Sequence, residues 1–305
     1  MKAKLIHLDF LIIGAQKAGT TSVHDWLVEN TSISLPAIKE THFFSHDKKF
    51  KKQSAWYEAQ FAKSVVGDIR GEVDPEYLFS PKASKRLHKY TDVNKFIILL
   101  REPLKRAFSQ YLMSVRRGYE KLPFDEALLQ ENSRLLDCDS GFASDHYSYI
   151  SRSLYSKQIG VYLEQFPDAE FLFIKFEDLI NKEKMKNVFN DICNFIGFPL
   201  DISLITKTKD SNKASVPRFN WLRDALYSRE KNAFFRKLLS NLLSEDIKLR
   251  LAIFLDKINQ KKINSKDNIM IDDYIIDGSI LDKIESDIIK TEKITGLCLE
   301  DWKRK

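Results

Sequence analysis

Two glycines separated by four residues frame a short segment with the residue types that bind an anion. Gly14 ends a run of apolar residues, and Gly19 is followed by three hydroxyl side chains, Thr20–Ser22. A buried strand, a glycine-bounded loop and the start of a helix together direct backbone N–H groups and the positive end of a helix dipole at one anion. The segment therefore predicts a phosphate-binding loop, although an ordinary glycine-bounded turn with a solvated lysine gives the same pattern.

The position of the lysine separates this segment from the Walker A loop. Walker A reads G-x-x-x-x-G-K-[ST], but here Thr20 occupies the lysine position and Lys17 lies inside the loop. A lysine at that place can lie along the bridge between a phosphate and the group that is transferred. The segment thus keeps the spacing of a phosphate loop and changes its chemistry.

Three stretches resemble motifs of one family, in the order in which that family has them. They are LIIGAQKAGTTS from Leu11, KETHFF at Lys39–Phe44 and LLREPLKRAFSQY at Leu99–Tyr111. Together they resemble sulfotransferases that use 3′-phosphoadenosine 5′-phosphosulfate (PAPS), above all bacterial members and the heparan-sulfate N- and O-sulfotransferases. The stretch GEVDPEYLFSP also resembles the family, but Val73 stands where the family often has a lysine.

The resemblance implies a donor site for PAPS and its product PAP. Its loop part consists of Gln16, Lys17, Ala18, Gly19, Thr20, Thr21 and Ser22, and Lys17 is expected to stabilise charge on the leaving phosphate. Arg101 and Ser109 match the motif for the 3′-phosphate. Arg101 directly follows a buried strand, where open α/β sheets bind ligands, and a guanidinium suits a phosphate. An ion pair with Glu102 or Asp178 is the alternative for Arg101.

Three further residues are expected at the nucleotide because of the resemblance. Tyr155 lies in a stretch that resembles the family's helix near the nucleotide, and core packing is its alternative. Lys213 and Arg218 lie within Asn212–Leu222, which resembles the family's loop over the nucleotide. A solvated basic loop is the alternative for these two.

Glu40 is the expected catalytic base, because the resemblance implies that the glutamate of the KETHFF-like motif takes the acceptor proton. His42 is expected to share that role or to hold the acceptor. The alternatives are an ion pair of Glu40 with Lys39 and a core position for His42. His42 and His46 stand at i and i+4, a metal-like spacing, but Asp47 is the only further ligand nearby, so we expect no metal.

Composition sets the broader expectations for the 305-residue chain. Its net charge of +6 is spread along the sequence, which suits an anionic ligand rather than nucleic acid. Three distant cysteines, Cys138, Cys193 and Cys298, indicate reduced thiols. No segment approaches the ~20 apolar residues that span a membrane. Because eukaryotic glycan sulfotransferases usually carry a Golgi anchor, we expect a soluble, cytoplasmic, bacterial protein.

Strand-like and helix-like segments alternate along the chain. Strands are expected at Phe10–Ile13, Val65–Val73, Lys95–Leu100 and Phe171–Phe176. One helix is expected over Phe124–Leu136 and a loop over Cys138–Ser151. The pattern predicts an α/β, P-loop-like three-layer fold with a central parallel sheet flanked by helices, a helical C-terminal part, and a single domain over residues 1–305.

The resemblance to PAPS-dependent sulfotransferases implies transfer of a sulfuryl group from PAPS to a hydroxyl or amine of a carbohydrate or glycan-like acceptor. One alternative is a P-loop kinase, in which Glu177-Asp178 after a strand imitates a Walker B carboxylate, but Thr20 opposes it. The other is a non-catalytic nucleotide- or glycan-binding protein, supported by the positive net charge. The combined presence of Lys17, Glu40 and Arg101 favours the enzyme.

Overall fold

The computed structural model describes residues 5–62, 64–65, 67–136, 141–199, 215–217, 258, 260–262 and 270–304. The chain divides into two compact units. The first comprises Met1–Arg106, Ser151–Ser211 and Ser279–Lys305, and the second comprises Ala107–Ile150 and Asn212–Gly278. The single domain expected over residues 1–305 stays a prediction.

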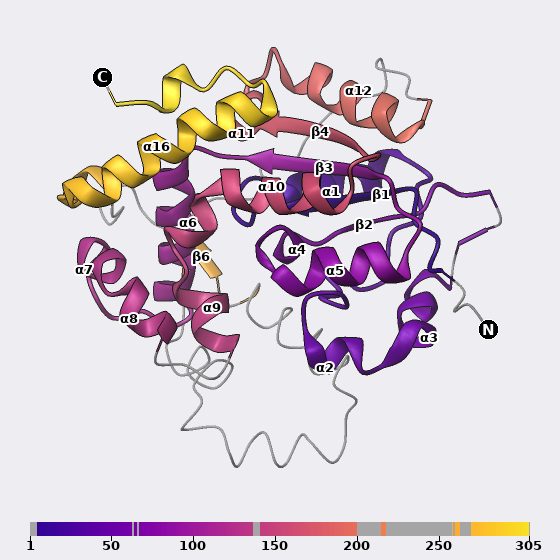
Figure 1. Cartoon of the computed structure of the whole chain (residues 1–305), viewed down its shortest axis with the longest axis horizontal. Helices are drawn as coiled ribbons and strands as arrows, with labels where there is room; N and C mark the ends of the chain where they lie inside the picture. The colour runs from indigo at the N-terminus through magenta and orange to yellow at the C-terminus, as the bar shows by residue number, and fades with distance from the viewer. Residues whose placement is uncertain are drawn as a thin grey trace. The chain divides into compact units, whose positions relative to one another are not determined.

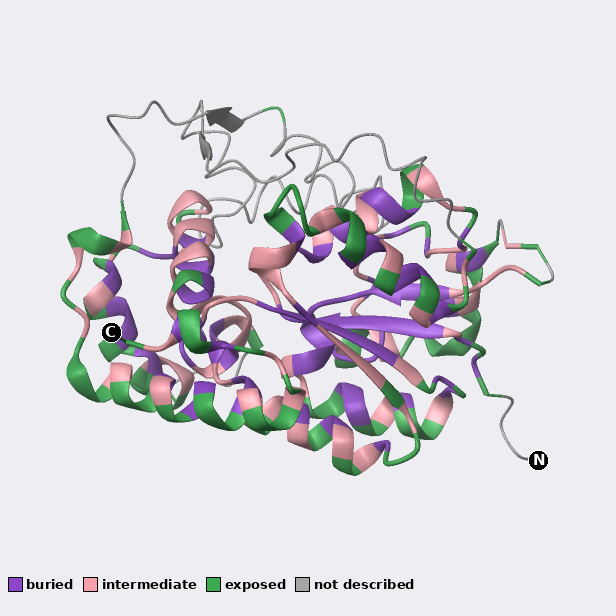
Figure 2. Ribbon diagram, turned by 90° about the horizontal axis from the view of Figure 1, so that it is seen from above, coloured by how far each residue is buried: buried purple, intermediate pink, exposed green. Residues whose placement is uncertain are grey.

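A four-stranded parallel sheet forms the centre of the first unit (Figure 1). Its strands are β1 (Phe10–Gly14), β2 (Gly71–Val73), β3 (Lys95–Leu100) and β4 (Glu170–Lys175), in the spatial order β2-β1-β3-β4. All five residues of β1 are buried, and Figure 2 shows the sheet as largely buried. Such continuous apolar strands are typical of a parallel sheet with both faces covered.

The helices of the first unit are α1 (Thr20–Asn30), α2 (Asp47–Phe50), α3 (Gln53–Glu58), α4 (Glu76–Phe79), α5 (Pro81–Tyr90), α10 (Tyr155–Gln165), α11 (Phe176–Ile180), α12 (Met185–Ile196) and α16 (Gly278–Thr295). Short 3₁₀ helices occur at Ala59–Phe61, Ser151–Ser153 and Glu300–Trp302. Within the described ranges, no helix is long and apolar enough to cross a bilayer.

Neighbouring residues of β3 show how helices cover both faces of the sheet. Adjacent side chains of a strand point to opposite faces. Lys95 Nζ donates to the Phe195 carbonyl of α12 (2.8 Å), whereas the Phe96 ring lies 5.6 Å from the Tyr162 ring of α10. The predicted α/β fold with a central parallel sheet between helices is therefore confirmed.

The second unit contains most of α6 (Pro103–Arg116), with α7 (Phe124–Leu129), α8 (Glu131–Leu136) and α9 (Gly141–Tyr147). The strands β5 (Ser215–Pro217) and β6 (Gln260–Lys262) pair antiparallel, and a 3₁₀ helix covers Ile271–Asp273. Rings of Phe108, Tyr111, Phe124 and Tyr274 pack together between α6 and α7.

Three predictions of local structure need correction. The loop expected over Cys138–Ser151 is wrong at α9, which is helical. Although this stretch is polar, its Phe142 ring packs against the ring of Tyr119, with the ring centres 5.1 Å apart. The helix expected over Phe124–Leu136 is two helices, interrupted at Gln130. Only the last three residues of the strand expected over Val65–Val73 are extended as β2.

The packing of β2 against β1 predicts that Gly71→Ala destabilises the protein. A Cβ at Gly71 would lie 2.3 Å from the ring of Phe10, which is fully buried. We expect unfolding free energy, measured in urea, to fall by about 1–3 kcal/mol because the core becomes overpacked. Gly160→Ala is the matched control: nothing lies within 4 Å of its Cβ position in α10, so stability should rise by about 0.5–1 kcal/mol. A harmless Gly71→Ala would contradict the described packing.

Candidate active site

The segment between β1 and α1 turns back on itself directly after the strand. The Ala15 N–H donates to the Leu99 carbonyl of β3 (2.6 Å), and the Ala18 N–H donates to the Ala15 carbonyl (3.1 Å). The structure thus brings the predicted residues Gln16 to Ser22 together in one loop and one helical turn, at the carboxyl end of β1.

Two residues of this loop have the left-handed backbone conformation. Gly19, the N-cap of α1, has φ of 91°, and Lys17 has φ of 72°. This region suits glycine but is uncommon for a residue with a side chain, and such strain gathers at functional sites. The first N–H groups of α1 have no partner within the helix, and its first turn contains no acidic residue. The loop has the features of an anion-binding site.

Two arginines after β3 bind carbonyl groups of the loop. Arg101 Nη1 donates to the Lys17 carbonyl (3.2 Å), and Arg106 Nη1 donates to the Gln16 carbonyl (3.3 Å). Arg106 is fully buried, and its Nε donates to Ser153 Oγ (2.6 Å). Because guanidinium groups hold these carbonyls, the loop conformation depends on the turn that follows β3.

Arg101 itself keeps a donor that faces no acceptor. Its Nε is buried and has no hydrogen-bond partner among the described residues, while its guanidinium lies 4.6 Å from the Phe176 ring centre. Asp178, an alternative partner considered for Arg101, pairs with Lys184 instead (2.7 Å). A buried, unpaired donor of a guanidinium fits a phosphate ligand.

Tyr155 contacts the residue that directly follows β3. The Tyr155 hydroxyl donates to the Arg101 carbonyl (2.7 Å), and its ring is buried, so Tyr155 supports the backbone of Arg101. Burial also raises the pKa of Tyr155. Ser109 lies on α6 within the second unit. Lys213 and Arg218 lie outside the described residues.

The Lys39 ammonium joins the loop to the expected base. Its Nζ donates to Thr21 Oγ1 (2.7 Å) and to Glu40 Oε1 (2.9 Å). Burial raises the pKa of Glu40, but the charges of Lys39 and His42 outweigh burial, and the net effect lowers this pKa. The ion pair weighed as an alternative for Glu40 is therefore present, and it also places an ionised carboxylate beside the anion-binding loop.

His42 is a cation in this environment. Its Nδ1–H donates to Asp74 Oδ1 (3.1 Å), and Asp74 is fully buried. Burial lowers the pKa of His42, but Asp74, with Glu40 and Glu76, outweighs burial and raises the pKa to about 10. At neutral pH His42 therefore carries its proton and supplies positive charge near Glu40.

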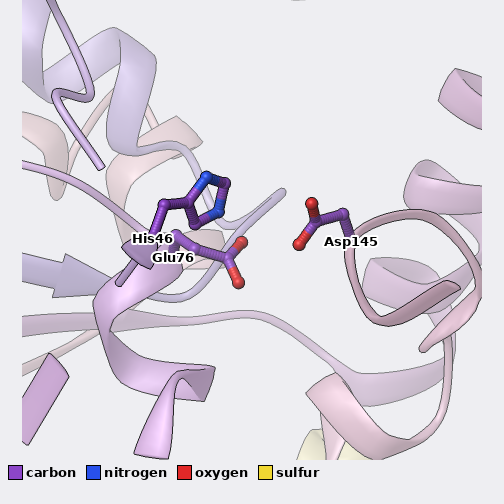
Figure 3. A group of neighbouring side chains, drawn as sticks. All are labelled: His46, Glu76 and Asp145. Carbon is purple, nitrogen blue, oxygen red and sulfur yellow. The ribbon is translucent and has the colours of Figure 1, made fainter. Parts of the chain in front are cut away.

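The metal-like spacing of His42 and His46 has a different structural basis. The two rings stack with their centres 4.9 Å apart. Figure 3 shows His46 beside Glu76; Asp145, also drawn, belongs to the second unit. Both Glu76 oxygens accept hydrogen bonds from Arg152 (2.8 Å each), so this carboxylate is already in a bidentate ion pair. The expected absence of a metal stays a prediction.

The sequence did not predict the supporting contacts of three residues. Lys39 was considered only as an ion-pair partner of Glu40, and Arg106 and Asp74 lie within stretches that resemble the family but were given no role. The sequence offered one signal for such supporting roles, namely a charged residue within an otherwise apolar stretch or within a recognised motif. Such a residue is buried only when the fold supplies a partner.

Comparisons with known proteins give a consistent result. Residues 7–267 match the family described as sulfotransferase domain. Heparan sulfate glucosamine 3-O-sulfotransferase 3B1 of Mus musculus is 27% identical over 171 residues, which are 56% of this chain and 42% of that protein. Heparan sulfate glucosamine 3-O-sulfotransferase 5 of Homo sapiens is 27% identical over 172 residues, 56% of this chain and 49% of that protein. The chain thus spans less than half the length of these relatives.

A solved structure shows the same fold. The crystal structure of a sulfotransferase from Alicyclobacillus acidocaldarius superposes with a TM-score of 0.63 at 23% sequence identity. The match covers 98% of this chain and 100% of that one.

The different environments of His42 and His24 predict that their pKa values are shifted in opposite directions. Asp74 raises the pKa of His42 to about 10, whereas burial lowers the pKa of His24, despite its contact with Asp25 (3.0 Å). In histidine-labelled protein observed by NMR, His42 should stay protonated up to pH 8 while His24 is neutral at pH 7. His42→Gln and His24→Gln assign the signals. A midpoint near 6.5 for His42 would contradict its pairing with Asp74.

Proposed function

The chain belongs to the sulfotransferase domain family, and on that premise we propose that it transfers a sulfuryl group from PAPS to a hydroxyl or amine of a carbohydrate or glycan-like acceptor. The observation that carries the proposal is the Lys39 ammonium, which contacts both Thr21 of the anion-binding loop and Glu40. A donor anion on the loop and a carboxylate base are thereby adjacent. The relatives named for heparan sulfate glucosamine support a carbohydrate acceptor.

The donor substrate is proposed to bind between the loop and Arg101. The N–H groups of the loop and of α1 face the 5′-phosphosulfate, together with the hydroxyl groups of Thr20, Thr21 and Ser22. Arg101 and Ser109 are proposed to bind the 3′-phosphate, and the unpaired Arg101 Nε supports this role. Tyr155 is proposed to act through Arg101, whose carbonyl it holds. Contacts from Lys213 and Arg218 remain part of the proposal because of the family resemblance.

The reaction assigns one role to each central side chain. Glu40 accepts the proton of the acceptor as the acceptor oxygen or nitrogen bonds to sulfur and the bond from sulfur to the 5′-phosphate oxygen breaks. Lys17 stabilises the negative charge that the phosphate of PAP gains. His42, as a cation, keeps Glu40 ionised and supplies positive charge, in place of the shared base role expected from sequence. The proposal needs no metal, because lysine and histidine supply the charge.

A cytoplasmic location is also proposed. Cys193 and Cys298, the two cysteines among the described residues, are free thiols. Free thiols on a chain of this size fit a reducing compartment.

Glu40→Gln should separate donor binding from catalysis. The amide keeps the size of the side chain but accepts no proton, so transfer of radiolabelled sulfate from PAPS to a panel of glycans should fall about 100-fold or more. Affinity for 3′,5′-adenosine bisphosphate should change less than about 3-fold, because the loop and Arg101 are untouched. Glu164→Gln, an exposed glutamate of α10, is the control with unchanged activity. Normal turnover by Glu40→Gln would remove Glu40 as the base.

Arg101→Ala should act chiefly on donor affinity. Loss of a charge-assisted contact to phosphate should raise the dissociation constant for the bisphosphate by about 10- to 100-fold. Affinity for adenosine 5′-phosphate, which has no 3′-phosphate, should fall less, by the part that comes from the lost contact of Arg101 with the Lys17 carbonyl. Lys105→Ala, an exposed cation in the first turn of α6, serves as the control for a general loss of positive charge. Equal losses for both nucleotides would place Arg101 away from the 3′-phosphate.

A further inference from the structure

Two buried carboxylates of the β2 segment face the turn that carries Glu40 and His42. Glu72 is the middle residue of β2, and Asp74, two positions after Glu72, directly follows the strand, so both lie on the same face. Neither side chain is exposed to solvent. Buried carboxylates are rare unless the fold supplies partners, so their contacts show what they hold.

Glu72 binds the turn on one side and the core on the other. Its Oε1 accepts hydrogen bonds from the Thr41 N–H (3.0 Å) and from Thr41 Oγ1 (2.6 Å). Its Oε2 accepts hydrogen bonds from the hydroxyls of Tyr57 (2.7 Å) and Tyr77 (3.0 Å). Four donors therefore converge on one carboxylate, and two of them belong to a single residue of the turn.

Asp74 binds the next residue of the same turn. Its Oδ2 accepts a hydrogen bond from the His42 N–H (2.6 Å), and its Oδ1 accepts from His42 Nδ1 (3.1 Å) and from the Glu76 N–H (3.1 Å). The backbone N–H groups of Thr41 and His42 are thus each held by a carboxylate. Two consecutive peptide groups of the turn are fixed by one side chain of β2, Glu72, and by Asp74 directly after it.

The turn needs such support. Glu40 has φ of 58° and His42 has φ of 53°, so both have the left-handed backbone that side-chain-bearing residues rarely adopt. Strain of this kind persists only where surrounding contacts determine the conformation. Thr41, between the two strained residues, is the residue that Glu72 binds through both its backbone and its side chain.

The paired carboxylates are themselves costly. Burial, together with the adjacent charge of Asp74, raises the pKa of Glu72 to about 7. Two apolar side chains would fill the same space without the free-energy cost of burying carboxylates, so packing alone does not account for the two acids. Their hydrogen bonds to the turn do account for them.

We propose that Glu72 and Asp74 are positioning residues, which hold Thr41 and His42 so that the Glu40 carboxylate lies against Lys39 and the anion-binding loop. The inference rests on the proposed function, since it concerns the placement of the proposed base. It goes beyond that function by assigning roles to two acids that contact neither the loop nor Glu40. Weakening this support should lower kcat and leave donor affinity unchanged, because the contacts that hold the backbone of the loop come from Leu99, Arg101 and Arg106.

The test compares two variants that each remove a hydroxyl bound to Glu72, one from the turn and one from the core; the Thr41 hydroxyl also accepts a hydrogen bond from the Phe43 N–H of the same turn (3.1 Å). Thr41→Val removes the hydroxyl that binds Glu72 from the turn, whereas Tyr57→Phe removes the hydroxyl that binds it from the core. For sulfate transfer from PAPS, we expect kcat to fall about 10-fold or more in Thr41→Val and less than about 2-fold in Tyr57→Phe. The dissociation constant for 3′,5′-adenosine bisphosphate should stay within about 2-fold in both. Unfolding curves correct each rate for the folded fraction.

Asp74→Asn provides an independent measurement. We expect the pKa of His42, followed by NMR, to fall towards its ordinary value, and kcat to fall about 10-fold or more with nucleotide affinity kept. Equal kcat in Thr41→Val and Tyr57→Phe, or unchanged kcat in Asp74→Asn, would overturn the positioning role while leaving the proposed function intact. Failure of the unmodified protein to transfer sulfate from PAPS would instead overturn the proposed function, and the positioning role with it.

Discussion

The pairing of β1 between β2 and β3 is the constraint on which the site depends. All three strands run parallel, so their carboxyl ends meet at one edge of the sheet, where open α/β sheets bind ligands. The loop follows β1, Asp74 follows β2 and Arg101 follows β3. A shift of β2 by one residue would turn Glu72 and Asp74 to the opposite face and remove the support of the turn that carries Glu40.

Charge around Glu40 is balanced between two requirements. A base must be ionised before the acceptor binds, and it must still accept a proton during transfer. Lys39 and His42 secure ionisation, because both lower the pKa of Glu40. On the proposed function, the bound donor brings negative charge close to these cations. On that function we expect the negative charge of the donor to offset the effect of these cations on Glu40.

The sequence predicted those parts of the site that lie within one continuous segment. Residues Gln16 to Ser22 form a loop and a helix start as expected, because glycine and hydroxyl positions act locally. The roles of Asp74 and Arg106 were not predicted, since each depends on a partner more than 30 residues away. The raised pKa of His42 was missed for the same reason: it is set by Asp74, which directly follows β2 and lies 32 residues further along the chain. The helix α9 was predicted as a loop because its sequence is polar. The contact of Phe142 with Tyr119, which is seen only in the folded chain, was not considered.

The most direct test of the account is a calorimetric titration of the unmodified protein with 3′,5′-adenosine bisphosphate, beside ATP with Mg²⁺ and adenosine 5′-phosphate. The account predicts tight binding of the bisphosphate without metal and weak binding of the other two, because Lys17 and Arg101 match a nucleotide with both a 5′- and a 3′-phosphate. A preference for ATP with Mg²⁺ would contradict the account and favour phosphoryl transfer. Binding of none of the three would contradict the assignment of the loop as a donor site.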